Sequence, residues 1–212
     1  MSLMIEDFGG RLASVWSELR PATRGLVERA LQARNPTPPN SSRSNVNTSS
    51  LPYDNRADRE LSSLLTALDE RVIESDLSQQ TDNRNQLRQI ADTCAAVLQE
   101  KTQSAEVFTQ LVRRADSQRD YARIDALADA LRRFSPTEIC ELARSDDAVV
   151  KALANEALAQ FPTSVLIGLL SDPVDSEIAR EALRRQALDY GSEEARQIVS
   201  ALDQMNLTQD DL

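Results

Sequence analysis

The stretch RRFSPTEICEL, residues 132–142, contains an aromatic residue followed directly by the start of a helix. Its S-P-T-E segment supplies a capping serine, a proline suited to the first helical position and a capping-box glutamate. The arrangement returns twice, because Phe134-Ser-Pro is followed by Phe161-Pro-Thr 27 residues later and by Tyr190-Gly-Ser after a further 29 residues. Periods of about 20 to 50 residues are typical of repeat proteins. The chain is therefore predicted to contain a short helical repeat.

Each of these breaks separates a longer apolar-periodic segment from a shorter one. We expect three helical pairs, over residues 121–142, 146–170 and 172–202. One pair cannot bury its apolar face alone, so the pairs are expected to stack on one another. The aromatic residue at each break would then fill the gap between one pair and the next. At the third break, Gly191 is suited to the left-handed conformation that closes a helix. Three unrelated helical hairpins with coincidental aromatic residues are the alternative.

Two segments of the repeat region share a more detailed pattern. LLSDPVDSEIAREAL at 169–183 has paired leucines, Asp-Pro, a branched aliphatic residue, a basic residue and paired small residues, and LARSDDAVVKALANEAL at 142–158 is similar. Over about residues 120–203 the chain resembles the HEAT-like family of α-helical repeats. The resemblance implies an all-α fold, a short right-handed α-solenoid of stacked helical hairpins. The units are shorter than is usual for that family, and an irregular helical bundle is the alternative.

Further helices are expected before the repeats. Apolar residues recur at helical spacing near residues 61–73, 87–98 and 105–112. No segment alternates with the period of two that is typical of strands. The body of the chain is therefore predicted to be all-α.

Composition divides the chain into four parts. Residues 1–34 are expected to form an N-terminal helical arm, and residues 57–203 the repeat domain. Between them, residues 35–56 are rich in Pro, Ser and Asn and are predicted to be a disordered linker, since they carry too few apolar side chains to offset the entropy of ordering. Residues 204–212 are expected to form an acidic tail.

The arm carries one apolar stripe at helical spacing, which includes the only tryptophan of the chain. The stripe contains Phe8, Leu12, Trp16 and Leu19. Gly9 and Gly10 weaken this helix, and a short helix of that kind is marginal alone, so the stripe must pack against something. Both docking on the repeat domain of the same chain and binding in a groove of another chain stay open.

Charge and hydropathy disfavour two classes of partner. The 212 residues include 34 acidic against 24 basic ones, a net charge of −10, whereas nucleic-acid-binding proteins usually carry a basic stripe. The longest apolar run, VLIGLL at 165–170, is far shorter than the roughly 20 residues that cross a membrane. We therefore expect no nucleic acid and no membrane as partner. Cys94 and Cys140 are expected to be buried free thiols, which suits a cytoplasmic protein.

The sequence lacks the residues that most enzymes use near neutral pH. It has no histidine, only two cysteines far apart, and no phosphate-binding motif among its five glycines. No catalytic residue, no metal site and no cofactor is predicted. The chain does offer carboxylates, and two of them with divergent pKa values in one cleft could still catalyse hydrolysis.

A local concentration of arginine lies between residues 113 and 133 and includes Arg119 and Arg123. Aspartates interleave with these arginines, which favours a surface of ion pairs. A site for an acidic peptide is the alternative interpretation, and nucleic acid, which some HEAT-like proteins bind, is a further one.

These observations predict a non-catalytic helical-repeat scaffold or adaptor that binds a protein partner, either another protein or a second copy of the chain. The alternatives are a HEAT-like enzyme, either a lyase or a carboxylate-dependent enzyme, and a nucleic-acid-binding repeat protein. The candidate partner-binding residues are Phe8, Leu12, Trp16, Leu19, Arg119 and Arg123.

Overall fold

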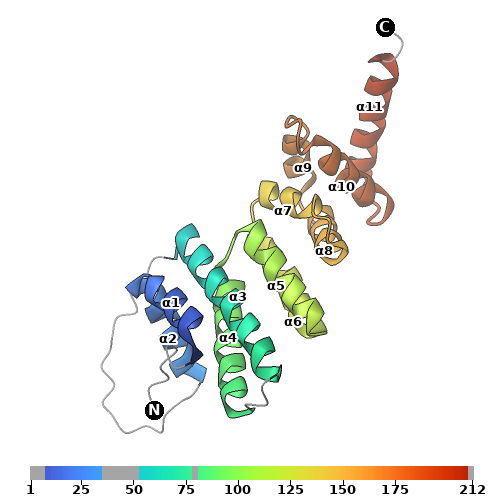
Figure 1. Ribbon diagram of the computed structural model, residues 1–212. Coiled ribbons are helices and arrows are strands. Elements are labelled where there is room, and N and C mark those ends of the chain that lie inside the picture. Colours follow the sequence, from blue (N-terminus) through green and yellow to red (C-terminus); the bar gives the residue numbers. More distant parts are fainter. Residues whose placement is uncertain (1–7, 35–52, 78–80, 210–212) are drawn as a thin grey trace. The chain divides into compact units, whose positions relative to one another are not determined.

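The computed structural model describes residues 8–34, 53–77 and 81–209 (Figure 1). Within these ranges every regular element is helical, and the prediction of an all-α protein is confirmed. The chain divides into two compact units, Met1–Leu111 and Val112–Leu212. None of the described helices is long and apolar enough to span a membrane.

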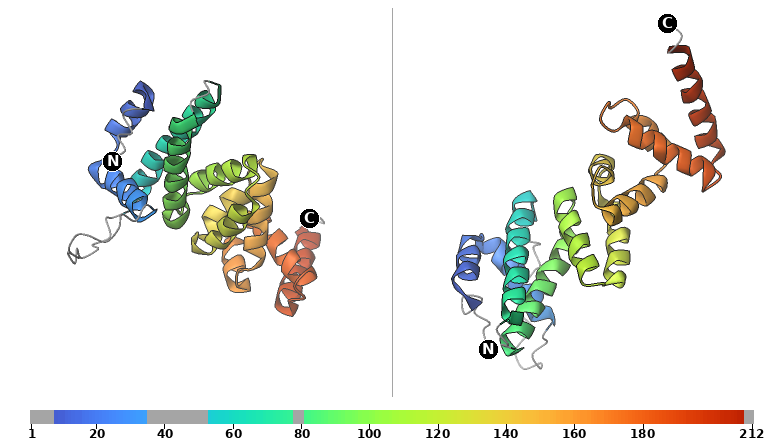
Figure 2. Two further views of the ribbon diagram at one scale, coloured as in Figure 1. Left: turned by 90° about the horizontal axis from the view of Figure 1, so that it is seen from below. Right: turned by 45° about the vertical axis from the view of Figure 1, so that its right-hand side comes forward.

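The first unit is built on a pair of long helices that the arm covers. Its elements are α1 (Gly10–Glu18), α2 (Pro21–Arg34), α3 (Asn55–Leu77), α4 (Thr81–Lys101) and the first half of α5 (Ala105–Ser117). Helices α3 and α4 pack along each other, α1 lies on α3, and α2 lies mainly on α4 (Figure 2). The shared core is leucine-rich because apolar residues recur on the facing sides of both long helices. Its fully buried members include Leu61, Leu64, Leu65, Leu68, Leu87, Ile90 and Leu98.

The start of the first helix of the arm follows from two glycines. Helix α1 begins at Gly10, and Gly9 has a φ of 121°, a backbone conformation that side chains with a Cβ rarely adopt. Phe8 lies before this break, although it was expected to belong to the helix. Residues 35–52, most of the predicted disordered linker, lie outside the described residues, and α3 already begins at Asn55.

The second unit consists of shorter helices in pairs. They are α6 (Tyr121–Ala130) with the 3₁₀ turn η2 (Leu131–Arg133), α7 (Pro136–Ala143), α8 (Ala148–Ala159), α9 (Thr163–Leu169), α10 (Ser176–Leu188) and α11 (Glu193–Gln209). Helix α7 packs on α8, and α10 packs on α8, α9 and α11. Side-chain caps begin α7 and α8, since Ser135 accepts from the backbone N–H of Glu138 and Asp147 from those of Val149 and Val150.

Two buried polar links join elements of the second unit. Nε2 of Gln186 on α10 donates to the backbone carbonyls of Ala159 at 3.1 Å and Phe161 at 2.6 Å, at the end of α8. The buried carboxylate of Asp175 lies 2.5 Å from Nη1 of Arg144, so it pairs with the end of α7. The third pair was expected to begin at Asp172-Pro173, but α10 starts only at Ser176. The preceding acids form a turn in which Asp175 is used for this ion pair.

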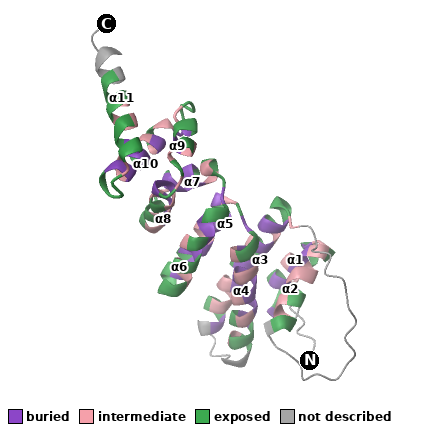
Figure 3. Ribbon diagram, turned by 180° about the vertical axis from the view of Figure 1, so that it is seen from behind, coloured by how far each residue is buried: buried purple, intermediate pink, exposed green. Residues whose placement is uncertain are grey.

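The three aromatic residues at the breaks do not share one environment, and this expectation was wrong. Each follows the end of a helix, as predicted, but Phe134 is 4% exposed, Phe161 is half-buried and Tyr190 is 52% exposed. Tyr190 belongs to the last helical pair, and no later pair covers it within the described part of the chain. Figure 3 shows the same trend in α11, whose residues are mostly exposed.

Smaller expectations concerned Gly191, the two cysteines and the tail. Gly191 adopts a φ of 66°, the left-handed conformation expected after α10. Cys94 and Cys140 are buried and free. Burial, together with the nearby carboxylate of Asp175, raises the pKa of Cys140 to about 11, so this thiol stays protonated at neutral pH. Residues 204–209, the start of the predicted acidic tail, continue helix α11.

Candidate interaction sites

The apolar stripe of the arm is buried inside the first unit. Phe8, Leu12, Trp16 and Leu19 are each less than 9% exposed, and α1 lies on α3. The arm therefore packs on its own chain, one of the two arrangements that the sequence left open. As partner-binding residues, these four side chains would be accessible only if the arm left α3.

A polar clamp holds the turn between α1 and α2 on the start of α3. Nε of Arg20 donates to Glu60 at 3.0 Å, and Nη2 of Arg20 contacts Asp54 at 2.6 Å. The hydroxyl of Thr23 donates to the same Glu60 carboxylate at 2.5 Å. The hydrogen bond from Arg20 holds the pKa of Asp54 well below its usual range. Burial would raise the pKa of Glu60, but the hydrogen bonds from Thr23 and Arg20 outweigh it and lower that pKa.

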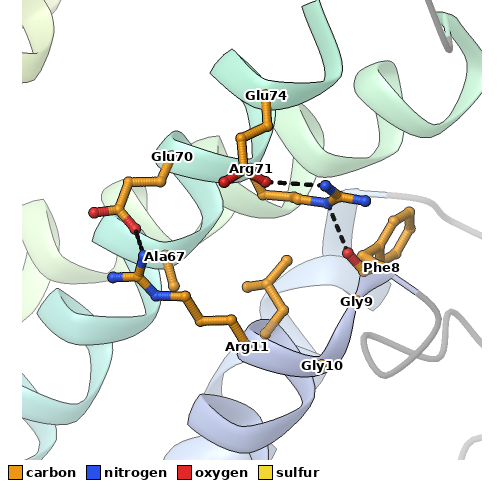
Figure 4. A pocket seen from close by; sticks show the side chains of 9 residues that line it. Phe8, Gly9, Gly10, Arg11, Ala67, Glu70, Arg71 and Glu74 are labelled. Atoms are coloured by element: carbon orange, nitrogen blue, oxygen red, sulfur yellow. Dashed lines mark hydrogen bonds and ion pairs between the residues drawn. The ribbon is translucent and has the colours of Figure 1, made fainter. Parts of the chain in front are cut away.

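A small cavity of about 170 Å³ lies beside the first turn of α1 (Figure 4). Arg11 on the arm contacts Glu70 on α3 at 2.7 Å. Nε of Arg71 donates to the backbone carbonyl of Phe8 at 2.8 Å, and its Nη1 contacts Glu74 at 2.9 Å. The contacts of Arg11 with Glu70 and of Arg71 with Phe8 cross the seam between α1 and α3, whereas the Arg71–Glu74 pair lies within α3. The cavity therefore belongs to the docking of the arm.

The second unit has a larger groove of about 290 Å³, between α6 with η2 on one side and α8 on the other. Its apolar lining consists of Ala128, Leu131, Leu153, Ala157 and Phe161. Its polar lining consists of Asp129 and Arg132 on the α6 side and Glu156 and Gln160 on the α8 side. The groove is open, because most of these residues are half-buried or exposed.

Local helical geometry explains how these side chains come to face the groove. On α8, the lining residues Leu153, Glu156, Ala157 and Gln160 are three and four positions apart, which places them on one face of the helix. On the other side, α6 tightens into η2 at Leu131. There Leu131 is buried and Arg132 is exposed.

Glu156 is the most constrained charge at the groove. The hydroxyl of Tyr190 donates to its Oε1, Nε2 of Gln160 donates to the same oxygen at 3.1 Å, and Nη2 of Arg185 lies 3.9 Å from Oε2. The hydrogen bond from Tyr190 is the largest cause that lowers the pKa of Glu156. Opposite, Asp129 and Arg132 form a long ion pair of 3.6 Å, and both side chains are 77% exposed. Such exposed pairs contribute little stability.

The two candidate arginines lie elsewhere. Arg119 is exposed in the turn before α6, where its φ is 55°, and Arg123 lies 3.7 Å from Asp120, the residue that caps α6. Arg113 likewise pairs with Asp147 at 3.1 Å. The ion-pair interpretation of this segment agrees with these contacts. Neither Arg119 nor Arg123 lines the groove.

The sequence interpretation missed the groove because it expected Phe161 to fill the gap between one helical pair and the next. One signal was available: Asp129 and Glu156 are 27 residues apart, the same interval that separates Phe134 from Phe161. In the predicted repeat, the two acids would therefore occupy equivalent positions of consecutive units.

Comparisons with protein-family models, with curated proteins and with solved structures gave no match. In the described ranges, no group of three or more Cys, Asp or Glu side chains is placed to hold a metal ion.

Proposed function

We propose that this chain is a non-catalytic helical-repeat protein that binds a segment of a protein partner in the groove between α6 and α8. The observation that supports the proposal is the apolar floor beside a charged rim, in which Leu153 and Phe161 stay half-buried next to the buried Leu131. Pockets for small molecules typically measure about 300–1,000 Å³ and enclose most of the ligand. An open groove of about 290 Å³ is better suited to one or two anchoring side chains of a protein segment.

The repeat architecture is part of the proposal. The second unit would be a short right-handed α-solenoid of HEAT-like pairs, and stacked pairs of this kind present extended binding surfaces. Packing of α7 on α8 and of α10 on both α8 and α9 is consistent with such stacking. Two free buried thiols are consistent with a role in the cytoplasm.

The enzyme alternative requires two acids in one cleft with divergent pKa values. Asp129 and Glu156 do line one groove, but hydrogen bonding lowers the pKa of Glu156, whereas a general acid needs a raised one. The geometry therefore favours recognition of charge over proton transfer. The nucleic-acid alternative has less support, because Arg113, Arg123 and Arg132 each have an acidic neighbour.

Substitution of Leu153 by arginine tests the proposal in the full-length protein. The half-buried position lets the longer side chain extend toward solvent, so the unit should fold while the groove is obstructed. Ile167→Arg on α9 is the matched control, because Ile167 is 42% exposed and does not line the groove. Circular dichroism confirms folding of both variants.

In affinity capture from a cell lysate, the wild-type chain and Ile167→Arg should retain the same proteins, and Leu153→Arg should lose them. Retention of the same set by Leu153→Arg would exclude the groove as the binding site. If no variant captures a protein, the proposed function is wrong.

A further inference from the structure

We propose that the groove between α6 and α8 selects a protein segment that carries Lys or Arg beside its apolar anchor. This inference rests on the proposed function and names the chemistry of the partner. It is drawn from the distribution of charge around the groove. The apolar floor by itself would not distinguish a cationic partner from an anionic one.

The second unit has an overall negative charge. Residues 112–212 contain 12 Lys and Arg against 19 Asp and Glu, so the unit carries −7 of the net −10 of the chain. A field of this sign raises the encounter rate with basic segments and disfavours acidic ones. The partner most compatible with this unit is therefore cationic.

The carboxylates are also placed on both sides of the groove. Asp129 on α6 lines it, and the exposed Asp125 lies one turn earlier on the same face. Glu156 lines the opposite side on α8. A Lys or Arg next to an anchor on the floor would lie between these two rims and could contact either of them.

The basic side chains at the groove do not cancel this preference. Arg132 lies 3.6 Å from Asp129 in a pair whose side chains are both 77% exposed, so an incoming cation can replace it at little cost. Arg185 lies 3.9 Å from Oε2 of Glu156, beyond hydrogen-bonding distance. The hydrogen bonds from Tyr190 and Gln160 go to Oε1, which leaves Oε2 to accept from a partner.

Glu156 is also pre-oriented for this contact. Tyr190 and Gln160 hold its carboxylate from two sides, so less side-chain entropy is lost when a cation binds. Charge-assisted hydrogen bonds of this kind are about twice as strong as those between neutral groups. Glu156 is therefore expected to contribute more to binding than Asp129.

The test uses the full-length chain and three fluorescein-labelled amphipathic peptides of about 14 residues, roughly four helical turns. All three have Leu at helical spacing, and their polar positions are Lys in the first, Gln in the second and Glu in the third. Fluorescence polarisation at low and at physiological salt measures the dissociation constants. The Lys peptide should bind most tightly, and its binding should weaken as salt increases.

Two double variants with equal net charge show whether the effect is local. Asp129→Asn with Glu156→Gln removes two rim charges and should weaken the Lys peptide about five- to tenfold. Glu177→Gln with Glu181→Gln removes two exposed charges from α10 outside the groove and should leave binding nearly unchanged. Equal losses in both double variants would show only a general electrostatic effect and overturn the inference.

Leu153→Arg separates failure of the inference from failure of the proposed function. If the Gln or Glu peptide binds best and Leu153→Arg abolishes that binding, the groove binds segments but does not select cations. If no peptide shows binding that Leu153→Arg removes, both proposals fail. If the chain dimerises in light scattering and Leu153→Arg abolishes the dimer, the occupant is a second copy and the cationic partner is wrong.

Discussion

The seam between α1 and α3 and the groove between α6 and α8 are lined by similar types of residue. They differ because the arm covers the seam, whereas the groove is open. Both have an apolar floor with arginine and glutamate or aspartate at the edge. At the seam, Arg11 of the arm pairs with Glu70 of α3, so charges connect the two sides. At the groove, Asp129 pairs with Arg132 and Glu156 with Gln160, each on its own side. The seam is closed mainly because Leu12 and Trp16 are buried in it, whereas Leu153 and Phe161 at the groove are only half-buried and leave it open to an occupant.

The largest difference between the seam and the groove should be in the free energy of unfolding that is lost when a leucine is truncated. Leu12 is 2% exposed at the seam, and Leu12→Ala is expected to cost about 2–5 kcal/mol of unfolding free energy in the first unit. Leu153 on the groove is half-buried, so Leu153→Ala should cost clearly less, and in the second unit only. Urea denaturation followed by the fluorescence of Trp16, the only tryptophan, reports on the first unit. A shift of this transition by Leu153→Ala would contradict the separation of the two units.

The next largest loss of stability should come from Gln186, which holds the end of α8 beside the groove. Gln186 donates to the carbonyls of Ala159 and Phe161, and Gln186→Ala leaves both acceptors without this partner. We expect a loss of about 1–3 kcal/mol in the second unit. Circular dichroism should show unfolding at a lower urea concentration than in the wild type, while the fluorescence of Trp16 should keep the wild-type midpoint. If the transition seen by circular dichroism does not move, these bonds do not stabilise the end of α8.

Low pH should destabilise the packing of the arm on α3, because it protonates the carboxylates of the polar clamp. The pKa values of Asp54 and Glu60 are lowered, so their contribution to stability is present above the unfolded pKa of about 4 and is lost as pH falls through the folded values. Burial raises the pKa of the neighbouring Asp58, whose contribution has the opposite sign and is lost as pH rises. We expect the emission of Trp16 to shift to longer wavelength below about pH 4. Asp54→Asn should reduce this dependence, and an unchanged pH profile would exclude the clamp as its source.

The smallest effects should come from two glycines with open space around them. An added Cβ would meet nothing within 4 Å at Gly10 on α1 or at Gly168 on α9. Alanine at either position should therefore stabilise its own unit, by about 0.5–1 kcal/mol. Gly9→Ala is the opposite control, because its φ of 121° makes an alanine strained. Thermal unfolding of each variant gives the sign, and a destabilising Gly10→Ala would show that the start of α1 requires glycine.

Sequence reasoning was most successful where structure depends on neighbouring residues. The capping serine at Ser135 and the left-handed Gly191 were both predicted, because caps and turns depend on a few adjacent positions. The buried stripe of the arm was also recognised from its spacing. The common environment expected for Phe134, Phe161 and Tyr190 was wrong, because burial depends on which helical pair comes next, and the structure describes no pair after the one that contains Tyr190.

The sequence by itself determined that the body of this protein is helical, where several of its helices begin and end, and which residues could form apolar faces. The physical reason is that helical periodicity and end caps are local properties. Only the tertiary structure decided that the arm covers α3 and that the face between α6 and α8 stays open. Whether an apolar face is covered depends on distant segments that pack against it, and a local pattern does not specify them.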